Sequence, residues 1–301
     1  MKKDTPPQQL HLPVLLDATL AVLKPQKDES YLDLTAGYGG HASAVISATG
    51  VPSKAVLVDR DENAIAELRP LEAKGVSLLH TDFYQAAAQL AQEGRQFDMI
   101  LLDLGVSSPQ FDRAERGFSL IQDGPLDMRM DNRETRTAAD LVNRMSEATL
   151  AGLIYQYGEE PKSRAIAKAI VRDRPITTTE QLAATVANAT RWGKSKVHPA
   201  TRTFQALRIA VNRELELLES TLPLLLKIIA PGGRLAIISF HSLEDRIVKH
   251  FFRELTEAGY EAEFSSLTKK PISGATDDVH NPRARSAKLR AVVKIKTKRK
   301  E

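Results

Sequence analysis

The sequence predicts an α/β protein in which a parallel sheet covered by helices is interrupted by an inserted all-helical domain. In the first third of the chain, short runs rich in Val, Ile and Leu alternate with helical patterns, as expected for strands buried on both faces. No such run occurs between residues 110 and 202, and the strand pattern returns afterwards. We therefore expect a core built from residues 1–109 and 203–301, with a helical insert at 110–202.

Each strand of the first part of the expected core is short and alternates with a helix of crossover length. Strands are predicted at 31–34, 55–58, 76–79, 97–102, 235–239 and 289–295. Helices are predicted between the early strands at 41–48, 61–69 and 84–93, in the insert at 137–157, 163–173 and 179–190, and on the return to the core at 203–228. This alternation is typical of a Rossmann-like core.

The composition is that of an ordinary globular protein without a membrane segment. Of 301 residues, 42% are hydrophobic and 27% are charged. No apolar run approaches the roughly 20 residues that cross a bilayer, and the basic start of the chain lacks the apolar stretch of a signal peptide. We therefore expect a cytoplasmic protein that does not bind membranes.

The chain has no cysteine, and its seven histidines are scattered. Disulfides, thiolate zinc sites and cysteine nucleophiles are thereby excluded. We predict no metal site, so catalysis has to use other groups.

The net charge of +4 is unevenly distributed, with the excess in the C-terminal segment. From Pro282 onward one acid, Glu301, accompanies nine basic residues, which are Arg283, Arg285, Lys288, Arg290, Lys294, Lys296, Lys298, Arg299 and Lys300. Such a block can neutralise the phosphates of a nucleic acid. A solvated, frayed terminus explains it equally well, so other features have to decide.

A glycine-rich turn follows the first predicted strand. Residues 33–41 read DLTAGYGGH, a strand end that runs into a glycine loop and then a helix. Glycines let a ligand approach the backbone closely. Asp59 ends the second strand about twenty residues later, where a carboxylate can accept both ribose hydroxyls of an adenosine cofactor. A tight turn and a capping acid are the alternative, but loop, strand order and acid spacing together favour an adenosine ligand.

The next two strand ends help to separate S-adenosylmethionine from a nicotinamide cofactor. After the third strand, Asp82 can reach an adenine edge and Phe83 offers a flat face; after the fourth, residues 103–110 read DLGVSSPQ. Methyl transfer from a sulfonium to an exocyclic amine needs alignment and acceptors for the amine hydrogens. Asp, Ser and backbone carbonyls supply such acceptors, so this loop favours base methylation, although turn formation explains each serine equally well.

Seven strings occur in order along the chain and together suggest a family. They are HLPVLL at 11–16, GGH at 39–41, LLDLGVSSPQFDRAERGFS at 101–119, DGPLDMRMD at 123–131, HPATRTFQALRIAVNREL at 198–215, PGGRLAIISFHSLEDRIVK at 231–249 and NPRARSAKLR at 281–290. In these strings the chain resembles the bacterial ribosomal RNA cytosine-N4 methyltransferases known as RsmH or MraW. Residues 254–281 and the lysine-rich end after Arg290 match no string of that family.

The resemblance implies a Rossmann-like S-adenosylmethionine-dependent methyltransferase core with an inserted helical substrate-recognition domain. It implies S-adenosylmethionine as the cofactor and, as the target, the N4 amine of a cytosine of 16S rRNA near the decoding centre of the small ribosomal subunit, cytosine 1402 in the family. The implied partner is that RNA within the small subunit, and no stable protein partner is expected. The cofactor positions that carry over are Gly39, Gly40, His41, Asp59, Phe83, Asp103 and Gln110, and Asp103 is also the candidate catalytic residue.

Two further groups of residues have alternative interpretations. At 239–246, SFHSLEDR ends the fifth strand, where His241 or Asp245 could hold the target base, or Ser242 could cap a helix with acids in its first turn. In the loop DMRMD at 127–131, Arg–Asp pairing is favoured over an interpretation in which the upstream Arg113 and Arg116 contact RNA phosphates and Phe118 stacks on a base.

The residues alone, without the resemblance, leave other functions open. The glycine loop and Asp59 also suit a nicotinamide-dependent oxidoreductase, and the basic surface suits a non-catalytic RNA-binding ribosome-assembly factor. A DNA cytosine-N4 methyltransferase is the nearest enzymatic alternative, but Ser107-Ser108-Pro109-Gln110 lacks the Pro-Pro-aromatic end typical of those enzymes.

Overall fold

The computed structural model describes residues 13–190, 198–259 and 262–295. The chain forms two compact units. Unit 1 comprises Met1–Asp59, Asn63–Leu104 and Leu222–Glu301, and unit 2 comprises Arg60–Glu62 and Gly105–Thr221. Unit 2 is thus wider than the expected insert at 110–202 and includes a short segment directly after the second strand.

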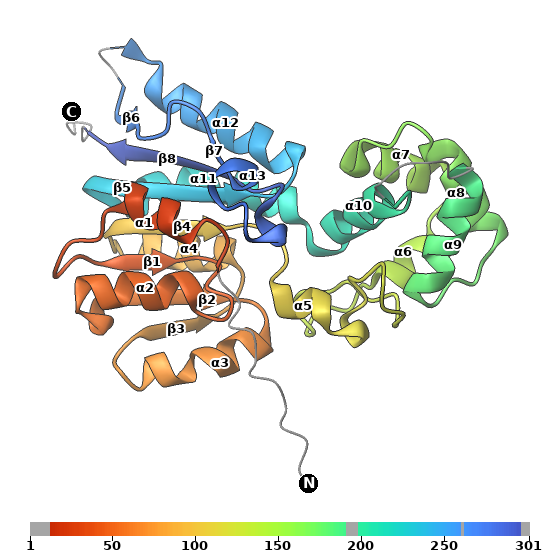
Figure 1. Cartoon of the computed structure of the whole chain (residues 1–301), viewed down its shortest axis with the longest axis horizontal. Coiled ribbons are helices and arrows are strands. Elements are labelled where there is room, and N and C mark those ends of the chain that lie inside the picture. Colours follow the sequence, from red (N-terminus) through yellow and green to blue (C-terminus); the bar gives the residue numbers. More distant parts are fainter. Residues whose placement is uncertain (1–12, 191–197, 260–261, 296–301) are drawn as a thin grey trace, which may run out of the picture. The chain divides into compact units, whose positions relative to one another are not determined.

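Unit 1 is built on one sheet in the strand order β3-β2-β1-β4-β5-β8-β6, with β7 paired to β8 (Figure 1). The strands are β1 (Tyr31–Asp33), β2 (Ala55–Asp59), β3 (Ser77–His80), β4 (Phe97–Asp103), β5 (Ile229–Ser239), β6 (Phe264–Ser266), β7 (Ile272–Ser273) and β8 (Lys288–Lys294). The first five are parallel, and β8 runs antiparallel to β5. The strand order reverses between β1 and β4, which is where ligands bind at the carboxyl ends of such sheets.

The predicted strands are confirmed, five of them to within one residue at either end. The exception is β5, which begins at Ile229 and not at residue 235, because Phe97 of β4 pairs with Ile229 on the far side of an irregularity in the pairing. The Pro231-Gly232-Gly233 segment, in which Gly232 has a φ of 77°, therefore lies inside the strand. β6 and β7 were not predicted, since they are only three and two residues long.

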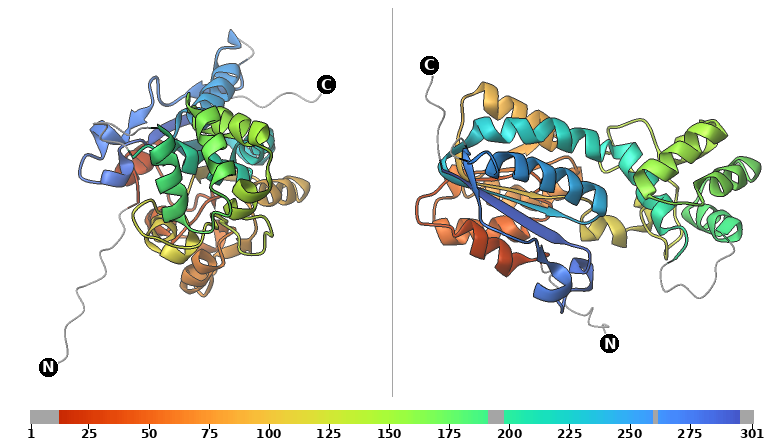
Figure 2. Two further views of the ribbon diagram at one scale, coloured as in Figure 1. Left: turned by 90° about the vertical axis from the view of Figure 1, so that its right-hand side faces the viewer. Right: turned by 90° about the horizontal axis from the view of Figure 1, so that it is seen from above.

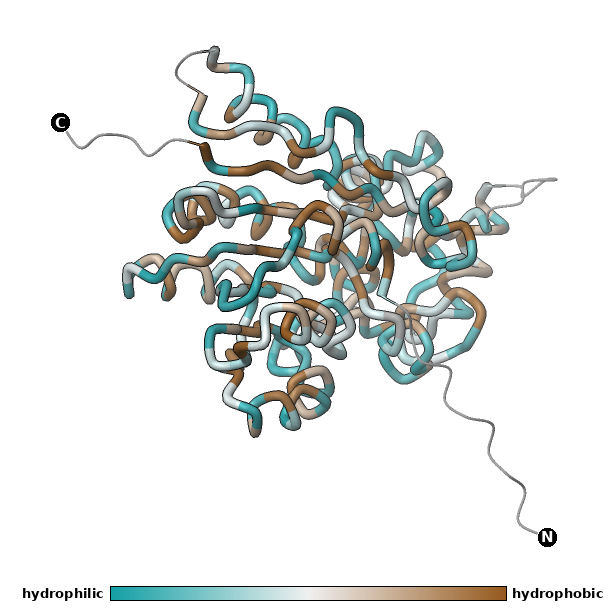
Figure 3. The backbone as a smooth tube through the Cα atoms, turned by 60° about the vertical axis from the view of Figure 1, so that its left-hand side comes forward, coloured by the Kyte–Doolittle hydropathy of each residue, from teal (hydrophilic) through white to brown (hydrophobic). Residues whose placement is uncertain are grey.

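Helices cover both faces of this sheet. They are α1 (Leu16–Leu23), α2 (Gly40–Thr49), α3 (Glu62–Glu72), α4 (Phe83–Gln92), α12 (Ser242–Thr256) and the short α13 (Gly274–Asp277). Figure 2 shows α1 and α2 on one face and α4 and α12 on the other. Met99 and Leu101 of β4 pack in the cluster under α1 and α2, while the alternate residue Ile100 is equally buried. Strands buried on both faces explain the continuous apolar runs, which appear brown in Figure 3.

Unit 2 is helical, apart from one isolated bridge between Pro125 and Thr178. Its helices are α5 (Ser108–Asp112), α6 (Ala138–Arg144), α7 (Glu147–Gly158), α8 (Ser163–Arg172), α9 (Thr179–Thr190), α10 (Thr201–Asn212) and the first part of α11 (Glu214–Ile228), which continues into unit 1. They enclose their own core, centred on residues such as Leu141, Ile154 and Leu207.

Two helices that were predicted as continuous are each broken in two. The predicted 137–157 ends at Met145, and α7 restarts where the Ser146 hydroxyl accepts the N–H of Thr149 as an N-cap. The predicted 203–228 breaks at Arg213, whose φ of 52° is left-handed. No helix among the described residues is both long enough and apolar enough to cross a membrane.

Part of the basic C-terminal block belongs to the fold. Lys294 is only 7% exposed, and its ammonium donates to the carbonyls of Leu226 and Ile229 at 3.0 and 3.1 Å. Burial lowers the pKa of this lysine. Lys288 and Arg290 both bind Asp245, at 2.9 and 2.7 Å. These three residues are structural, and Lys296, Lys298, Arg299 and Lys300 lie outside the described residues.

Candidate functional site

The glycine loop rests on a buried carboxylate at the end of β1. Asp33 is 1% exposed and accepts hydrogen bonds from the Tyr31 hydroxyl at 2.8 Å and the Thr35 N–H at 3.2 Å. Burial raises the pKa of Asp33 to about 6 and raises that of Tyr31 well above its usual value. Thr35 in turn accepts the N–H of Asp103 at 2.6 Å, so the ends of β1 and β4 are tied together.

Asp59, at the end of β2, is tied to the same loop. Its Oδ2 accepts the N–H of Gly37 at 2.8 Å. Gly37 has a φ of 52°, and a Cβ at this position would come no closer than 3.9 Å to any other atom. The carboxylate expected to bind a ribose therefore also holds the open part of the loop in place.

Neighbouring side chains closely approach Gly39 and Gly40, and Gly39 also has a positive φ in the turn. Gly39 has a φ of 80°, and a Cβ there would meet Leu68 at 2.9 Å. A Cβ on Gly40 would lie 2.5 Å from Pro13. The close neighbours of these two positions are protein side chains, whereas a Cβ on Gly37 would make only an ordinary contact with the Thr35 carbonyl. Gly37 was part of the recognised loop but was not among the predicted cofactor residues, and its positive φ and open surroundings are visible only in the structure.

His41 and Asp103 form a pair at the start of α2 and the end of β4. His41 Nε2 lies 3.7 Å from Asp103 Oδ2, longer than a hydrogen bond, and the histidine side chain is 7% exposed. Burial opposes protonation, but the adjacent carboxylate outweighs it and raises the pKa of His41 above its usual value. Among the described residues, both ring nitrogens of His41 and Oδ1 of Asp103 are buried and have no partner in hydrogen-bond geometry. Buried polar atoms of this kind point to a ligand.

At the end of β3, Asp82 is a helix cap. Its Oδ1 accepts the N–H groups of Tyr84 and Gln85, both at 2.9 Å, at the start of α4. A carboxylate at this position satisfies the unpaired donors of the first helical turn. Phe83, the first residue of α4, is 8% exposed, so most of its ring is within the core.

The loop after β4 belongs to unit 2, where Gln110 is part of a buried network. Gln110 Oε1 accepts the Ser107 N–H at 3.0 Å, and its Nε2 donates to Asp61 Oδ2 at 2.7 Å. Arg116 donates to both oxygens of Asp61 and to the carbonyls of Arg129 and Met130. Asp61 is 2% exposed. The sequence did not identify it as a site residue, because nothing in its local pattern indicates that it pairs with Arg116, 55 positions away.

In the charged loop near Asp127 the arginines pair with aspartates, which is the interpretation that the sequence favoured. Arg129 pairs with Asp127 and Arg133 pairs with Asp131, at 2.6 and 2.7 Å. Arg116 is committed to Asp61, and Phe118 is 5% exposed within the core of unit 2. The alternative, in which Arg116 contacts RNA and Phe118 stacks on a base, is therefore wrong for these two residues.

At the end of β5 a side chain caps the following helix, as one of the two interpretations predicted, but the capping residue is not the predicted Ser242. His241 and not Ser242 is the N-cap of α12, and Glu244 Oε2 accepts the N–H of Phe240 at 2.8 Å. Asp245 binds Lys288 and Arg290, and these contacts outweigh the effect of burial and lower its pKa. Because the Asp245 carboxylate is already paired with two basic side chains, it is not available to hold a base.

Comparisons with known proteins decide the family. The model of the MraW methylase family matches residues 8–295. The chain belongs to this family. A relative from Acidobacterium capsulatum, described as ribosomal RNA small subunit methyltransferase H, is 46% identical over 95% of this chain and 99% of its own. One of the same description from a Cyanothece strain is 47% identical over 96% of both chains.

Among solved structures, a putative rRNA methylase from Clostridium thermocellum aligns with a TM-score of 0.45 at 11% identity, covering 94% of this chain and 97% of that one. The sheet of unit 1, the helical unit 2 and the family match confirm the predicted fold class, a Rossmann-like methyltransferase core with a helical insert. The methylase is S-adenosylmethionine-dependent, as expected.

The residues of unit 1 fit this cofactor chemically. Its ribose hydroxyls and ammonium need acceptors, and its carboxylate needs a donor. Asp59 and Asp103 are carboxylates at the ends of β2 and β4, and His41 with a raised pKa can donate from a charged ring. The partnerless buried atoms of His41 and Asp103 are the observation on which this fit rests.

Proposed function

We propose that this chain methylates the N4 amine of a cytosine in 16S rRNA of the small ribosomal subunit, near the decoding centre, corresponding to the family target cytosine 1402. The observation that carries the proposal is the similarity over almost the whole chain, 46 and 47% identity, to relatives described as ribosomal RNA small subunit methyltransferase H. An RNA substrate of this kind places the protein in the cytoplasm.

The proposed cofactor-site residues, which contact the cofactor or shape its site, are Gly39, Gly40, His41, Asp59, Phe83, Asp103 and Gln110. Asp59 accepts ribose hydroxyls while it holds the loop through Gly37. Gly39 and Gly40 act mainly through the shape of the loop, and Phe83 can offer only the exposed edge of its ring. Gln110 acts by fixing the loop after β4, since its amide nitrogen and oxygen are already engaged by Asp61 and Ser107.

Asp103 is the proposed catalytic residue. When bound, S-adenosylmethionine supplies the methyl group from its sulfonium. The lone pair of a cytosine amine is delocalised into the ring, and an acceptor for the amine hydrogens makes it available for attack. Oδ1 of Asp103 is a buried acceptor with no partner among the described residues. The backbone of Asp103 is held in place because its N–H donates to the Thr35 hydroxyl. Because the amine acidifies only as positive charge develops on nitrogen, no strong base is needed beforehand.

Mass spectrometry of small-subunit RNA from cells with and without this chain tests the proposal directly. We expect one N4-methylated cytosine to disappear when the chain is removed, to return fully with the wild type and to return to a smaller extent with Asp103→Asn. Retention of the methyl group in cells without the chain would overturn the proposed target.

Two controls separate the alternatives. Calorimetry with S-adenosylmethionine and with reduced nicotinamide cofactor should detect binding of the first alone, because the oxidoreductase interpretation requires the second. An assembly factor would bind the small-subunit RNA without methylating it, so incorporation of a labelled methyl group into that RNA distinguishes an enzyme from such a factor.

A further inference from the structure

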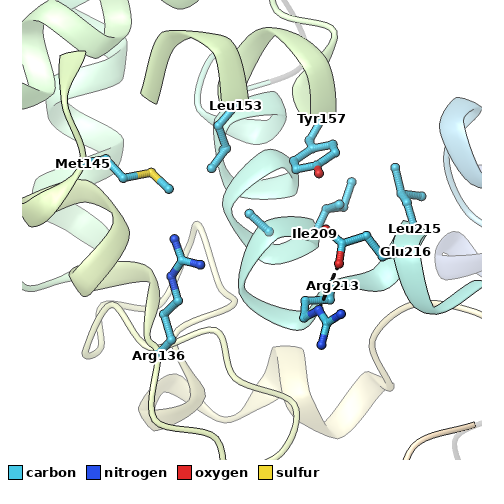
Figure 4. Close-up of a pocket in the computed structure, with 9 residues that line it drawn as sticks. Arg136, Met145, Leu153, Tyr157, Ile209, Arg213, Leu215 and Glu216 are labelled. Atoms are coloured by element: carbon cyan, nitrogen blue, oxygen red, sulfur yellow. Dashed lines mark hydrogen bonds and ion pairs between the residues drawn. The ribbon is translucent and has the colours of Figure 1, made fainter. Parts of the chain in front are cut away.

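A pocket of about 180 Å³ lies among the helices of unit 2. Figure 4 shows that its walls come from α7, α10, the start of α11 and the segments on either side of α6. The volume is below the roughly 300–1,000 Å³ of pockets that take whole drug-sized molecules, so this pocket has room only for a smaller fragment. All of its lining residues lie between 136 and 216, and none belongs to the candidate cofactor site.

One side of the pocket is apolar and aromatic. Leu153 and Tyr157 of α7 face Ile209 of α10, and Met145 closes the side next to α6 (Figure 4). Tyr157 is only partly buried, and its ring borders the cavity. Aromatic and aliphatic walls of this kind bind the faces of unstacked bases without regard to sequence.

The opposite side carries charge. Among the described residues Arg136 has no ion pair or hydrogen bond, and Figure 4 shows its side chain at the edge of the pocket. Arg213 donates to Glu216 at 3.0 Å, which places a donor and an acceptor together at the rim. Burial, and after it the charges of Glu216 and Glu219, raises the pKa of Tyr157; a tyrosine hydroxyl is a donor at neutral pH even without this shift.

We propose that this pocket holds one unstacked base of the RNA substrate, from a nucleotide other than the one that is methylated, with Arg136 on the adjacent phosphate. This rests on the proposed function, because it takes RNA as the substrate. The combination of an apolar aromatic wall, a polar rim and an unpaired guanidinium matches the face, the edge and the phosphate of one nucleotide. A hydrophobic peptide side chain would use the wall but not Arg136.

The principal test removes the unpaired charge. Arg136→Gln in the full chain should raise the KM for small-subunit RNA at least about fivefold, as expected when one interaction between a charged group and a phosphate is removed. The KM for S-adenosylmethionine and the melting temperature should not change, since Arg136 is exposed and has no partner among the described residues. Arg144→Gln is the matched control: its side chain is 82% exposed, pairs with Asp140 and lines no part of the pocket.

A second variant fills the pocket without removing any polar group. Ala210 lines the pocket on α10, so Ala210→Leu should weaken RNA binding by a factor similar to that of Arg136→Gln, because it takes the space of the base. Ala184→Leu adds the same volume at an exposed position of α9 and should have no effect. Ultraviolet crosslinking of the wild type to the RNA, followed by mass spectrometry, should identify the peptide that contains Tyr157.

The failures of the two proposals are distinguishable. Absence of methyl incorporation by the wild type would contradict the proposed function. If the wild type methylates the RNA and both pocket variants have the same RNA KM as their controls, the pocket proposal is overturned and the function stands. A change in RNA KM confined to Arg136→Gln, with Ala210→Leu like its control, would also overturn the base pocket, because Arg136 would then contact RNA outside it.

Discussion

Gln110 Nε2 donates a 2.7 Å hydrogen bond to Oδ2 of Asp61, linking the loop after β4 to the segment that follows β2 in the chain. The same carboxylate receives Arg116 at 2.9 Å, and both side chains of this ion pair are less than a tenth exposed. The network thus combines two residues of the recognised strings, Gln110 and Arg116, with Asp61, which no motif had marked.

Removing Asp61 should strongly destabilise unit 2. Asp61→Ala leaves the Arg116 guanidinium buried without its anion, and breaking a buried pair in this way costs about 3–5 kcal/mol. Denaturant unfolding measures the difference in the free energy of unfolding. As a control, Glu72→Ala removes the partner of Arg69 in an ion pair on the surface, and it should lower the free energy of unfolding by less than about 1 kcal/mol. Equal effects of the two variants would show that the buried network does not stabilise the chain.

This network illustrates what the sequence could and could not predict. Strand and helix positions follow from local periodicity, so every predicted strand is present. The pairing of Asp61 with Arg116 joins residues 55 positions apart and depends on the fold, which local patterns do not encode. The break at Arg213 escaped prediction for a related reason: Asn212 accepts the Met130 N–H and donates to the Met128 carbonyl, so tertiary contacts end α10 at this point.

The same distinction holds for the candidate site. The strand pattern located the strand ends that carry Asp59 and Asp103, because a strand followed by a polar residue is a local signal. The glycine loop as a sequence did not separate Gly39 and Gly40, which neighbouring side chains approach closely, from Gly37, where a Cβ would make only an ordinary contact. The count of basic residues grouped Lys294 with the basic tail, although its ammonium is bound to two backbone carbonyls.

Asp59→Ala should weaken binding of S-adenosylmethionine roughly tenfold or more. A charge-assisted hydrogen bond contributes about 1.5–3 kcal/mol, and the carboxylate is proposed to accept ribose hydroxyls as well as the Gly37 N–H. Calorimetry gives the affinity. Asp59→Asn keeps an acceptor for Gly37 and removes the charge, so it should lie between the alanine variant and the wild type; unchanged affinity in a folded alanine variant would exclude a ribose contact.

Asp103→Asn should reduce turnover at saturating S-adenosylmethionine more than it reduces stability. The variant keeps the shape of the side chain and one acceptor, and the backbone bond to Thr35 does not involve the carboxylate. Single-turnover methylation of the RNA together with thermal unfolding separates the two effects. Full turnover in this variant would show that the charge of Asp103 is dispensable.

The buried Asp33 predicts a specific dependence of stability on pH. Its pKa is raised from 3.8 to about 6, so the folded state binds the proton more tightly than the unfolded state. The resulting stabilisation is complete below pH 3.8 and is lost as the pH rises through about 6, a change of about 3 kcal/mol. Asp33→Asn cannot ionise, so relative to the wild type it should gain stability between pH 4 and 7.

Denaturant unfolding of both proteins across this range measures the difference. Because all other titrating groups are shared, the acid denaturation common to both proteins cancels. A stability difference that is independent of pH would show that Asp33 does not titrate in this window.

The last prediction concerns the basic end of the chain, which we expect to contact RNA phosphates through the four residues beyond the described fold, Lys296, Lys298, Arg299 and Lys300. Replacing all four with Gln should weaken RNA binding and flatten its dependence on salt, by about 0.7–0.9 logarithmic units of slope for each phosphate that is no longer neutralised. Affinity for S-adenosylmethionine should stay the same, since the cofactor residues lie at strand ends. Lys294→Gln is the contrasting variant, because it removes a buried donor to two carbonyls and should lower stability without changing the salt slope. A salt slope that is unchanged in the fourfold variant would mean that the tail is only a solvated terminus.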